Sequence, residues 1–190
     1  MIQLRALSHP LPDLDKLDAK SNDMELAELF EAYYERIFNY IRYRIDDRYT
    51  AEDLTSQVFE KMLAKRSTFR ADRSPFEVWL FAIARNTVND HFRGLRRQRL
   101  FSLELFKETQ STQKGPESMT IARESEDDLT NALQALKTKE RHIVALKFGA
   151  GLKNVEIAQL LDISESNVGV MLFRVMKKLK LELERNDRDE

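Results

Sequence analysis

The spacing of apolar side chains is the feature that most constrains this chain. Over most of its length they recur every three or four residues, which is the pattern of amphipathic helices packed on a core. The sequence has five glycines and four prolines among 190 residues, too few for the many tight turns of a sheet-rich protein. We therefore predict an all-α fold without strands.

Three helices are expected in the first half of the chain. They cover residues 23–45, 50–63 and 74–93. Thr50 and Ser74 stand at two of the expected starts as N-caps, each with an acidic residue three positions later, which is the pattern of a capping box. Gly94 is expected to end the third helix.

Helices are expected again in the second half. Residues 125–136 carry leucines at helical spacing, and Thr138 and Ser164 are expected to cap two later helices. The segment Asn154–Lys178 contains two helical stretches separated by a short turn, Asp162–Ile163. This layout predicts a helix-turn-helix.

The chain is expected to form two small helical domains joined by a flexible linker. The predicted parts are a flexible leader (1–22), a first domain (23–99), a linker (100–124), a helix-turn-helix domain (125–185) and a tail (186–190). The linker has no helical period, yet it begins with Phe101, Leu103, Leu105 and Phe106. These side chains either dock on a partner or pack on their own domain.

Charge is sorted along the sequence although the net charge is −1. Residues 84–99 hold five arginines and one aspartate, whereas residues 100–128 hold seven acids and three bases. The pattern indicates basic surfaces separated by an acidic connector.

The helix over 74–93 offers two different faces. Trp79 lies on its apolar stripe and is expected mainly in the core. The opposite face carries Arg85, Asn86, Asn89, Asp90 and Arg93. Amides and guanidinium groups suit unstacked nucleic acid, and an ordinary solvated helix face is the alternative interpretation.

The second helix of the expected helix-turn-helix presents polar and basic side chains outward. They are Ser166, Asn167, Gly169, Val170, Phe173, Arg174 and Lys177. A recognition helix inserts its N-terminal half into the major groove, and basic residues farther along contact phosphates. DNA binding is therefore expected, and a generic helical hairpin is the alternative.

Several classes of protein and site are excluded or disfavoured. The chain has no cysteine, which excludes disulfides and thiolate zinc sites and suits the cytoplasm. No signal peptide or apolar run long enough to insert in a membrane is present. His9, His91 and His142 are isolated in sequence, and no glycine loop for phosphates is found. We expect no metal, no cofactor and no catalytic activity.

Over residues 23–183 the sequence resembles a known family. The matching segments are LFEAYYERIFNYIRY (29–43), AEDLTSQVF (51–59), residues 69–93 and residues 139–178. In order and spacing they are similar to bacterial RNA polymerase sigma factors of the extracytoplasmic-function (ECF) group. The resemblance implies a protein that binds core RNA polymerase, recognises the −35 and −10 promoter elements and helps to melt promoter DNA. The family often uses an anti-sigma factor as a further partner.

The resemblance also implies site residues. For the −10 element they are Phe69, Arg70, Arg85, Asn86, Asp90 and Arg93, with Phe69 and Arg70 in a loop that receives a flipped base. For the −35 element they are Ser166, Asn167, Val170, Phe173, Arg174, Lys177 and Lys178. For core polymerase they are Asp53, Thr55 and Gln57.

The recognition helix departs from the usual family pattern at Gly169, Val170 and Met171. The family commonly has basic or small polar residues there. Val170 is expected to touch a thymine methyl group, and Gly169 to allow close approach of the backbone.

Three other kinds of protein are alternatives to a sigma factor. A conventional helix-turn-helix regulator would not require the segment 53–57 or the helix over 74–93. A structural adaptor would not require sorted basic helices, and an enzyme lacks its catalytic constellation. Sigma-factor function is the prediction.

Overall fold

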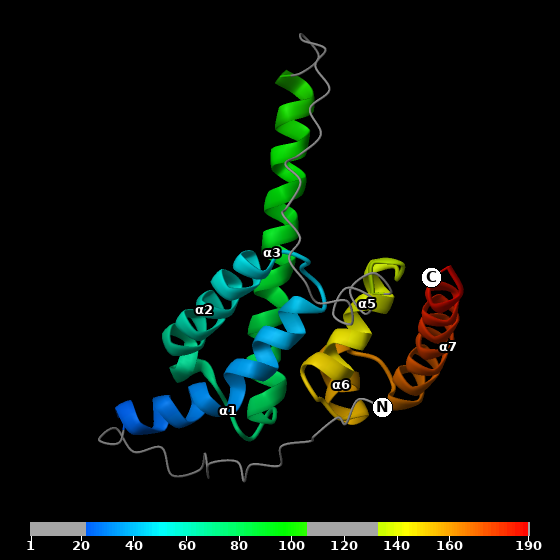
Figure 1. The fold of residues 1–190 in the computed structure, drawn as a ribbon. Coiled ribbons are helices and arrows are strands. Elements are labelled where there is room, and N and C mark those ends of the chain that lie inside the picture. The colour runs from blue at the N-terminus through cyan, green and yellow to red at the C-terminus, as the bar shows by residue number, and fades with distance from the viewer. Residues whose placement is uncertain (1–21, 106–132, 190) are drawn as a thin grey trace.

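The computed structural model describes residues 22–105 and 133–189, with side chains over 26–98 and 133–181. All regular structure in these ranges is helical, as the apolar spacing predicted (Figure 1). The elements are α1 (Asn22–Arg42), α2 (Arg48–Lys65), η2 (Arg66–Thr68), α3 (Phe76–Leu105), α5 (Thr138–Val144), the π-helical turn η4 (Ala145–Gly149), α6 (Asn154–Leu161) and α7 (Glu165–Asp189). Most of the predicted leader and linker, residues 125–132 of the helix expected over 125–136, and residue 190 lie outside the described residues. Residues 186–189 were predicted as a tail but continue helix α7.

The start of α2 differs from the prediction. The helix begins at Arg48, and the Asp47 carboxylate accepts a hydrogen bond of 2.7 Å from the backbone N–H of Thr50. Hydrogen bonds from the Thr50 side chain and backbone hold the pKa of Asp47 below its usual value. The prediction that Thr50 is the N-cap was wrong, because the aspartate three residues earlier satisfies the free N–H group.

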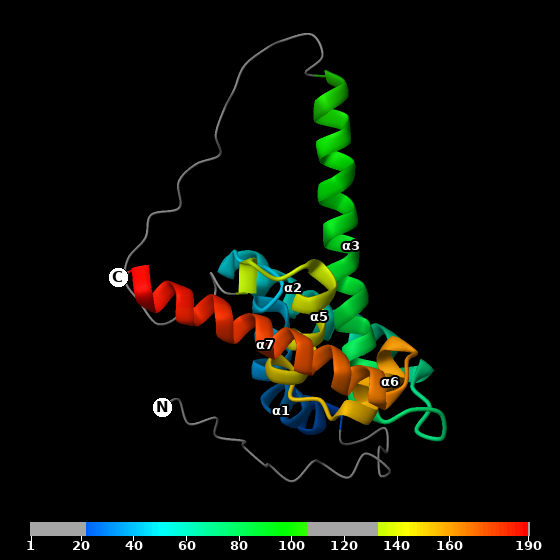
Figure 2. The same cartoon turned by 90° about the vertical axis from the view of Figure 1, so that its right-hand side faces the viewer.

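Both ends of α3 also differ from the prediction. The Ser74 hydroxyl donates to the carbonyl of Pro75 at 3.3 Å, and the helix begins at Phe76. At the other end, α3 continues through Gly94 to Leu105 and projects from the rest of the described chain (Figure 2). A glycine inside a helix costs only about 1 kcal/mol relative to alanine, so the helix formers on either side of Gly94 carry the helix past it.

The helices of the second half begin close to where they were expected. The backbone N–H of Asn167 donates to the Ser164 hydroxyl at 3.2 Å, which confirms Ser164 as the cap of α7. The backbone N–H of Lys137 donates to the Glu140 carboxylate at 2.8 Å, so the cap of α5 is one residue before the predicted Thr138. Asp162 ends α6 in the left-handed conformation, with φ of 55°.

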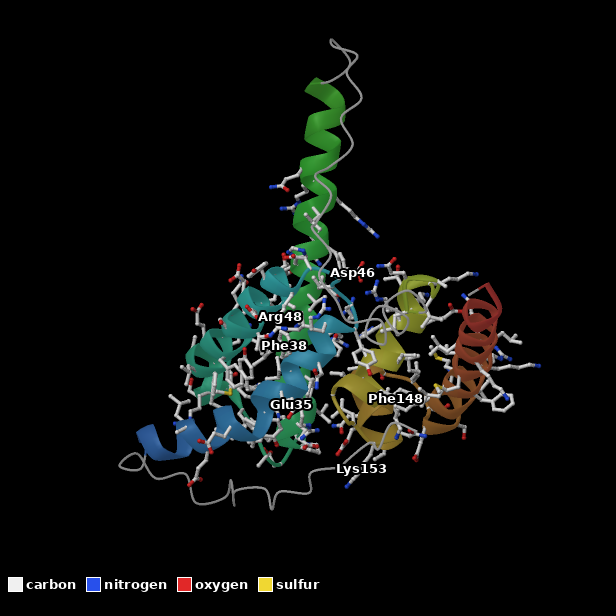
Figure 3. All side chains as sticks on the ribbon, viewed as in Figure 1. Glu35, Phe38, Asp46, Arg48, Phe148 and Lys153 are labelled. Carbon is white, nitrogen blue, oxygen red and sulfur yellow. The ribbon has the colours of Figure 1, made fainter. Side chains whose placement is uncertain are left out.

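The predicted apolar stripes form the core. The buried residues include Leu29, Ile37, Ile41, Val58, Leu80, Val88, Ile143, Val168, Leu172 and Val175. Three residues expected in these stripes are more exposed than predicted. They are Phe30 on α1, Leu63 on α2 and Phe148 on η4, of which Figure 3 labels Phe148.

The two halves of the described chain share this core. We call residues 22–105 the first domain and residues 133–189 the second domain. Helix α1 packs against η4, and α3 packs against α6 (Figures 1 and 2). Buried Tyr40 and Ile41 of α1 belong to the same apolar cluster as Leu146 and Ala150 of the second domain. The two domains are therefore in direct contact as well as joined by the chain.

Candidate nucleic-acid interface

The outer face of α3 carries most of the residues predicted to bind the −10 element. Asn86, Asp90 and Arg93 are exposed there, as is Asn89. Arg93 donates to the Asp90 carboxylate at 2.9 Å, one turn earlier on the helix. The Asn89 amide oxygen accepts from the Arg44 guanidinium at 3.1 Å. Two of these polar side chains are thus oriented by neighbours, which prepares this face for hydrogen bonding.

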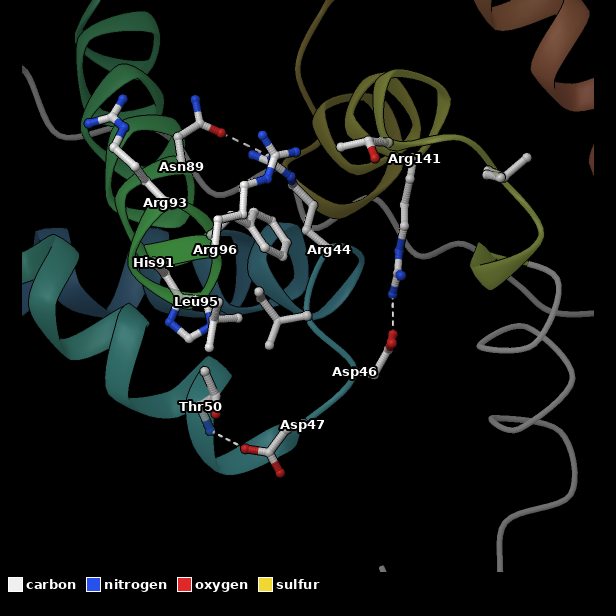
Figure 4. A pocket seen from close by; sticks show the side chains of 14 residues that line it. Arg44, Asp46, Asp47, Thr50, Asn89, His91, Arg93, Leu95, Arg96 and Arg141 are labelled. Carbon is white, nitrogen blue, oxygen red and sulfur yellow. Dashed lines mark hydrogen bonds and ion pairs between the residues drawn. The ribbon is translucent and has the colours of Figure 1, made fainter. Parts of the chain in front are cut away.

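One end of this face borders an open pocket of about 810 Å³ (Figure 4). The pocket lies between the α1–α2 connection, α3 and the start of α5. Its charged lining residues are Arg44, Asp46, Asp47, Arg93, Arg96 and Arg141. Arg141 of the second domain pairs with Asp46 of the first. The second domain therefore reaches one edge of the exposed polar face of α3.

Arg85 has a different environment from Asn86 beside it. Its guanidinium donates to the carbonyl of Leu160 at the end of α6, and its side chain is half-buried. In this structure Arg85 therefore binds the second domain, and it does not lie on the open face with Asn86 and Arg93.

The loop before α3 is lined by an aromatic group. Phe69 lies edge-on to Phe76, with ring centroids 5.4 Å apart, and its centroid is 5.3 Å from that of Trp79. Arg70 is exposed and donates to two carbonyls of its own loop, those of Ser67 and Phe69. Trp79 is partly buried against the core, in line with its predicted scaffold role. This loop and Arg93 are separated by about 25 Å along α3, at 1.5 Å per residue.

The residues predicted to bind polymerase divide into two groups. Asp53 and Gln57 are exposed one turn apart on α2. Thr55 is fully buried, and its hydroxyl donates to the Ala51 carbonyl at 2.7 Å. Thr55 shares the buried stripe of Ala51 and Val58, so helical spacing was the signal that could have placed it in the core.

Helix α7 presents the residues predicted to bind the −35 element. Ser166, Asn167, Val170, Phe173, Arg174 and Lys177 are all exposed on it. Lys178 is instead directed toward its own domain, where its ammonium group donates to the Ala135 carbonyl and to the Glu140 carboxylate, both at 3.0 Å. Because of these bonds, Lys178 does not lie with the exposed residues that were predicted to bind DNA.

Two further contacts between the domains were also not predicted. Arg36 of α1 donates to the Ala150 carbonyl at 2.8 Å and to the Glu77 carboxylate at 2.6 Å. The Tyr40 hydroxyl lies 3.2 Å from Nε2 of His142 and accepts from Arg44 at 2.9 Å. For the Arg36 contact the sequence offered one signal. Arg36 comes three residues after Tyr33 on an otherwise apolar face, where an arginine needs a partner.

Burial, with the nearby charges of Arg44 and Arg85, lowers the pKa of His142 to about 3. The imidazole is therefore neutral at pH 7. Since Arg44 donates to the Tyr40 hydroxyl, the hydroxyl proton is free to bond Nε2 of His142. Tyr40 thus links an arginine of the first domain to a histidine of the second.

The described residues contain no group of three or more His, Cys, Asp or Glu side chains that could hold a metal ion. Within the same ranges, no helix is long and apolar enough to span a membrane.

Comparison with known proteins gives the family of both domains. Residues 29–98 match the family described as Sigma-70 region 2, and residues 126–179 match Sigma-70, region 4. The chain is 30% identical over 169 residues to the RNA polymerase sigma factor YlaC of Bacillus subtilis, covering 87% of this chain and 95% of that protein. It is 31% identical over 157 residues to the ECF RNA polymerase sigma factor BldN of Streptomyces coelicolor, which covers 80% of this chain but 58% of BldN.

Solved structures share the fold. The sigma factor RpoE from Bartonella quintana, solved with the anti-sigma factor NepR, gives a TM-score of 0.63 at 18% identity, covering 84% of this chain and 97% of that one. CnrH, solved with the cytosolic domain of CnrY, gives 0.63 at 22% identity, covering 86% and 90%. With the two matched regions and the relatives at this coverage, the chain belongs to the ECF group of RNA polymerase sigma factors, which direct core RNA polymerase to promoters.

Proposed function

We propose that this chain binds core RNA polymerase and starts transcription through two DNA-binding faces, one on each domain. The observation that carries the proposal is the exposed face of α7 in the domain that matches region 4. Polar Ser166 and Asn167 are exposed near the start of the helix, and the exposed cations Arg174 and Lys177 lie about two to three turns farther along. This is the arrangement by which a recognition helix contacts bases first and phosphates farther along.

The first domain binds the −10 element through α3 and the loop before it. Asn86 offers an amide to an unstacked base, while Arg93, oriented by Asp90, contacts the backbone. The loop with Phe69 and Arg70 receives a flipped base. Arg85 joins this surface only when its bond to the Leu160 carbonyl is released.

Core polymerase binds α2 at exposed Asp53 and Gln57. Thr55 supports this face from the core and makes no contact of its own, because its side chain is fully buried. The protein acts in the cytoplasm, where polymerase and promoter DNA are found, and it contributes no catalytic chemistry.

An anti-sigma factor is a further partner of this chain. Of the two structural neighbours named above, RpoE was solved with an anti-sigma factor and CnrH with the cytosolic domain of CnrY. Because α1 packs against η4, the two domains are in contact, and such a partner can bind across both of them. A bound partner would then keep Arg85 against the Leu160 carbonyl.

Reconstituted transcription with core polymerase tests the proposal. Specific initiation that depends on this chain is the expected result, and an ordinary regulator would not replace the sigma factor in this assay. Arg174→Ala should weaken binding of the upstream element and reduce the slope of log K against log salt by about 0.9, the value for one phosphate contact. Glu165→Gln, a change at the other end of the exposed face, should not reduce the slope.

A further inference from the structure

We propose that α7 reads thymine methyl groups in the −35 element through an apolar row formed by Val170 and Phe173. The inference rests on the proposed function of the second domain. Beyond that function, the inference names the group on the DNA that α7 recognises and the two residues that contact it.

The row lies on the solvent side of the helix. Val170 is 47% exposed and Phe173 is 74% exposed. They are three residues apart, so they are neighbours on one face. The apolar residues between and beside them, Val168, Leu172 and Val175, are buried. Val170 and Phe173 are therefore not needed to hold α7 on its domain.

The helix has few other groups with which to read bases at this point. Ser166 and Asn167 can hydrogen-bond base edges, but they are confined to the first turn. Gly169 has no side chain, and no atom lies within 4 Å of the place where its Cβ would be. Apart from Arg174 and Met176, the second and third turns therefore offer an open backbone, an isopropyl group and a phenyl ring.

The positive charge of α7 indicates which kind of molecule binds this face. From Ser166 to Lys180 the sequence has four lysines and arginines and no acid. Arg174 and Lys177 are exposed beside the row. An apolar row framed by cations fits the floor of a groove between two phosphate backbones, and DNA is the polyanion that offers such a groove.

Among the four bases, thymine alone presents a methyl group in the major groove. Contact of that group with Val170 or Phe173 removes apolar surface from water on both sides. Loss of one buried methyl changes the affinity by roughly three- to fivefold. The −35 element is therefore expected to contain thymines at positions where removal of the 5-methyl group alone weakens binding.

The experiment uses the full chain bound to core polymerase. Duplexes with a randomised upstream segment are selected for binding, and each thymine of the selected sequence is then replaced in turn by deoxyuracil. This base keeps every hydrogen-bonding group and lacks the methyl. Wild type should lose about three- to fivefold in affinity at one or two positions. Val170→Ala and Phe173→Ala should each bind the thymine duplex more weakly and become insensitive to deoxyuracil at one of those positions.

Two control variants keep the test specific. Lys177→Ala should weaken binding of thymine and deoxyuracil duplexes equally and lower the salt slope. Leu181→Ala should change neither, since Leu181 is also exposed, at 59%, but lies about 16 Å beyond Val170 along the helix. Circular dichroism should show unchanged unfolding of the Val170 and Phe173 variants.

The outcomes separate this inference from the proposed function. Specific binding that is indifferent to every methyl group would overturn the methyl contact and leave the sigma-factor function intact. Unchanged DNA binding by Phe173→Ala, with loss of a protein partner, would also overturn it. If the polymerase complex selects no sequence at all, both the proposed function and the inference fail.

Discussion

Gly149 of the second domain packs directly on the backbone of Tyr40 in the first. A Cβ atom added at Gly149 would lie 2.9 Å from both the Cα and the N atom of Tyr40. A Cβ atom essentially never lies this close to another heavy atom outside its own chain neighbours, and neither partner can rotate away because the obstacle is backbone. Glycine at this position is therefore a condition of the contact between the domains.

Gly149→Ala is expected to force α1 and η4 apart and to cost about 1–3 kcal/mol, the usual range for overpacking. Urea denaturation measures the cost. The separation itself can be followed with dyes on Glu60→Cys and Lys153→Cys, because the chain has no other cysteine. Gly94→Ala is the matched control, since nothing lies within 4 Å of its added Cβ. It should stabilise α3 by about 0.5–1 kcal/mol.

Arg36→Met should destabilise the protein by about 2–3 kcal/mol, since it leaves the Glu77 carboxylate and the Ala150 carbonyl without this donor in a partly buried site. Thermal or urea unfolding provides the measurement. Glu52→Gln removes the exposed pair of Arg48 and Glu52 instead. That change should cost less than about 0.5 kcal/mol, and equal losses in the two variants would contradict the assignment.

Acid should loosen the contact around His142. Its pKa is lowered to about 3 in the folded protein from the usual 6.5, so between these values the unfolded chain binds a proton that the folded chain does not. The stability is fully present above pH 6.5 and falls as the pH is lowered toward 3, by up to about 1.4 kcal/mol per pH unit.

His142→Gln isolates this effect, because glutamine can still accept from Tyr40 but does not titrate. Unfolding of both proteins between pH 7.5 and 5.5 should show a loss in wild type that is about 1 kcal/mol larger than in the variant. Parallel pH profiles would show that His142 carries a proton equally in both states.

Asn86→Ala should impair formation of the open complex while leaving the affinity for core polymerase unchanged. Permanganate reactivity of unpaired thymines follows melting, and a loss of about tenfold corresponds to one hydrogen bond near 1.4 kcal/mol. Asp53→Ala should show the reverse pattern, with weaker polymerase binding. Normal melting by Asn86→Ala would remove Asn86 from the site.

Local features of the fold were predictable because they depend on neighbours in sequence. Ile37 and Ile41 on α1, and Val168 and Val175 on α7, recur at helical spacing in the sequence and are buried in the core. Ser164 was identified as a cap because its hydroxyl bonds an N–H group three residues away. Where two local signals competed, as at Asp47 and Thr50, the stronger cap decided the helix start.

Contacts between distant segments were not predictable in this way. Arg36 meets Ala150, and Arg85 meets Leu160, across large separations in sequence. Arg85 was assigned to the −10 element from its place on the polar face of its helix, and nothing in the sequence shows that Ala150 or Leu160 lies near either arginine. Lys178 was likewise assigned to DNA, since nothing in the sequence shows that Glu140 lies within reach of its ammonium group.

The long projection of α3 bears on how the domains can separate. The helix ends at Leu105, and the described chain resumes at Leu133. A connection of residues 106–132 can reach roughly 90 Å when fully extended. Chain length therefore sets no practical limit on the distance between the domains. Separation is opposed by the contacts between the domains, among them those of Gly149, Arg36, Arg85, Arg141 and His142, so single substitutions can weaken the contact without any change in the number of residues between the domains.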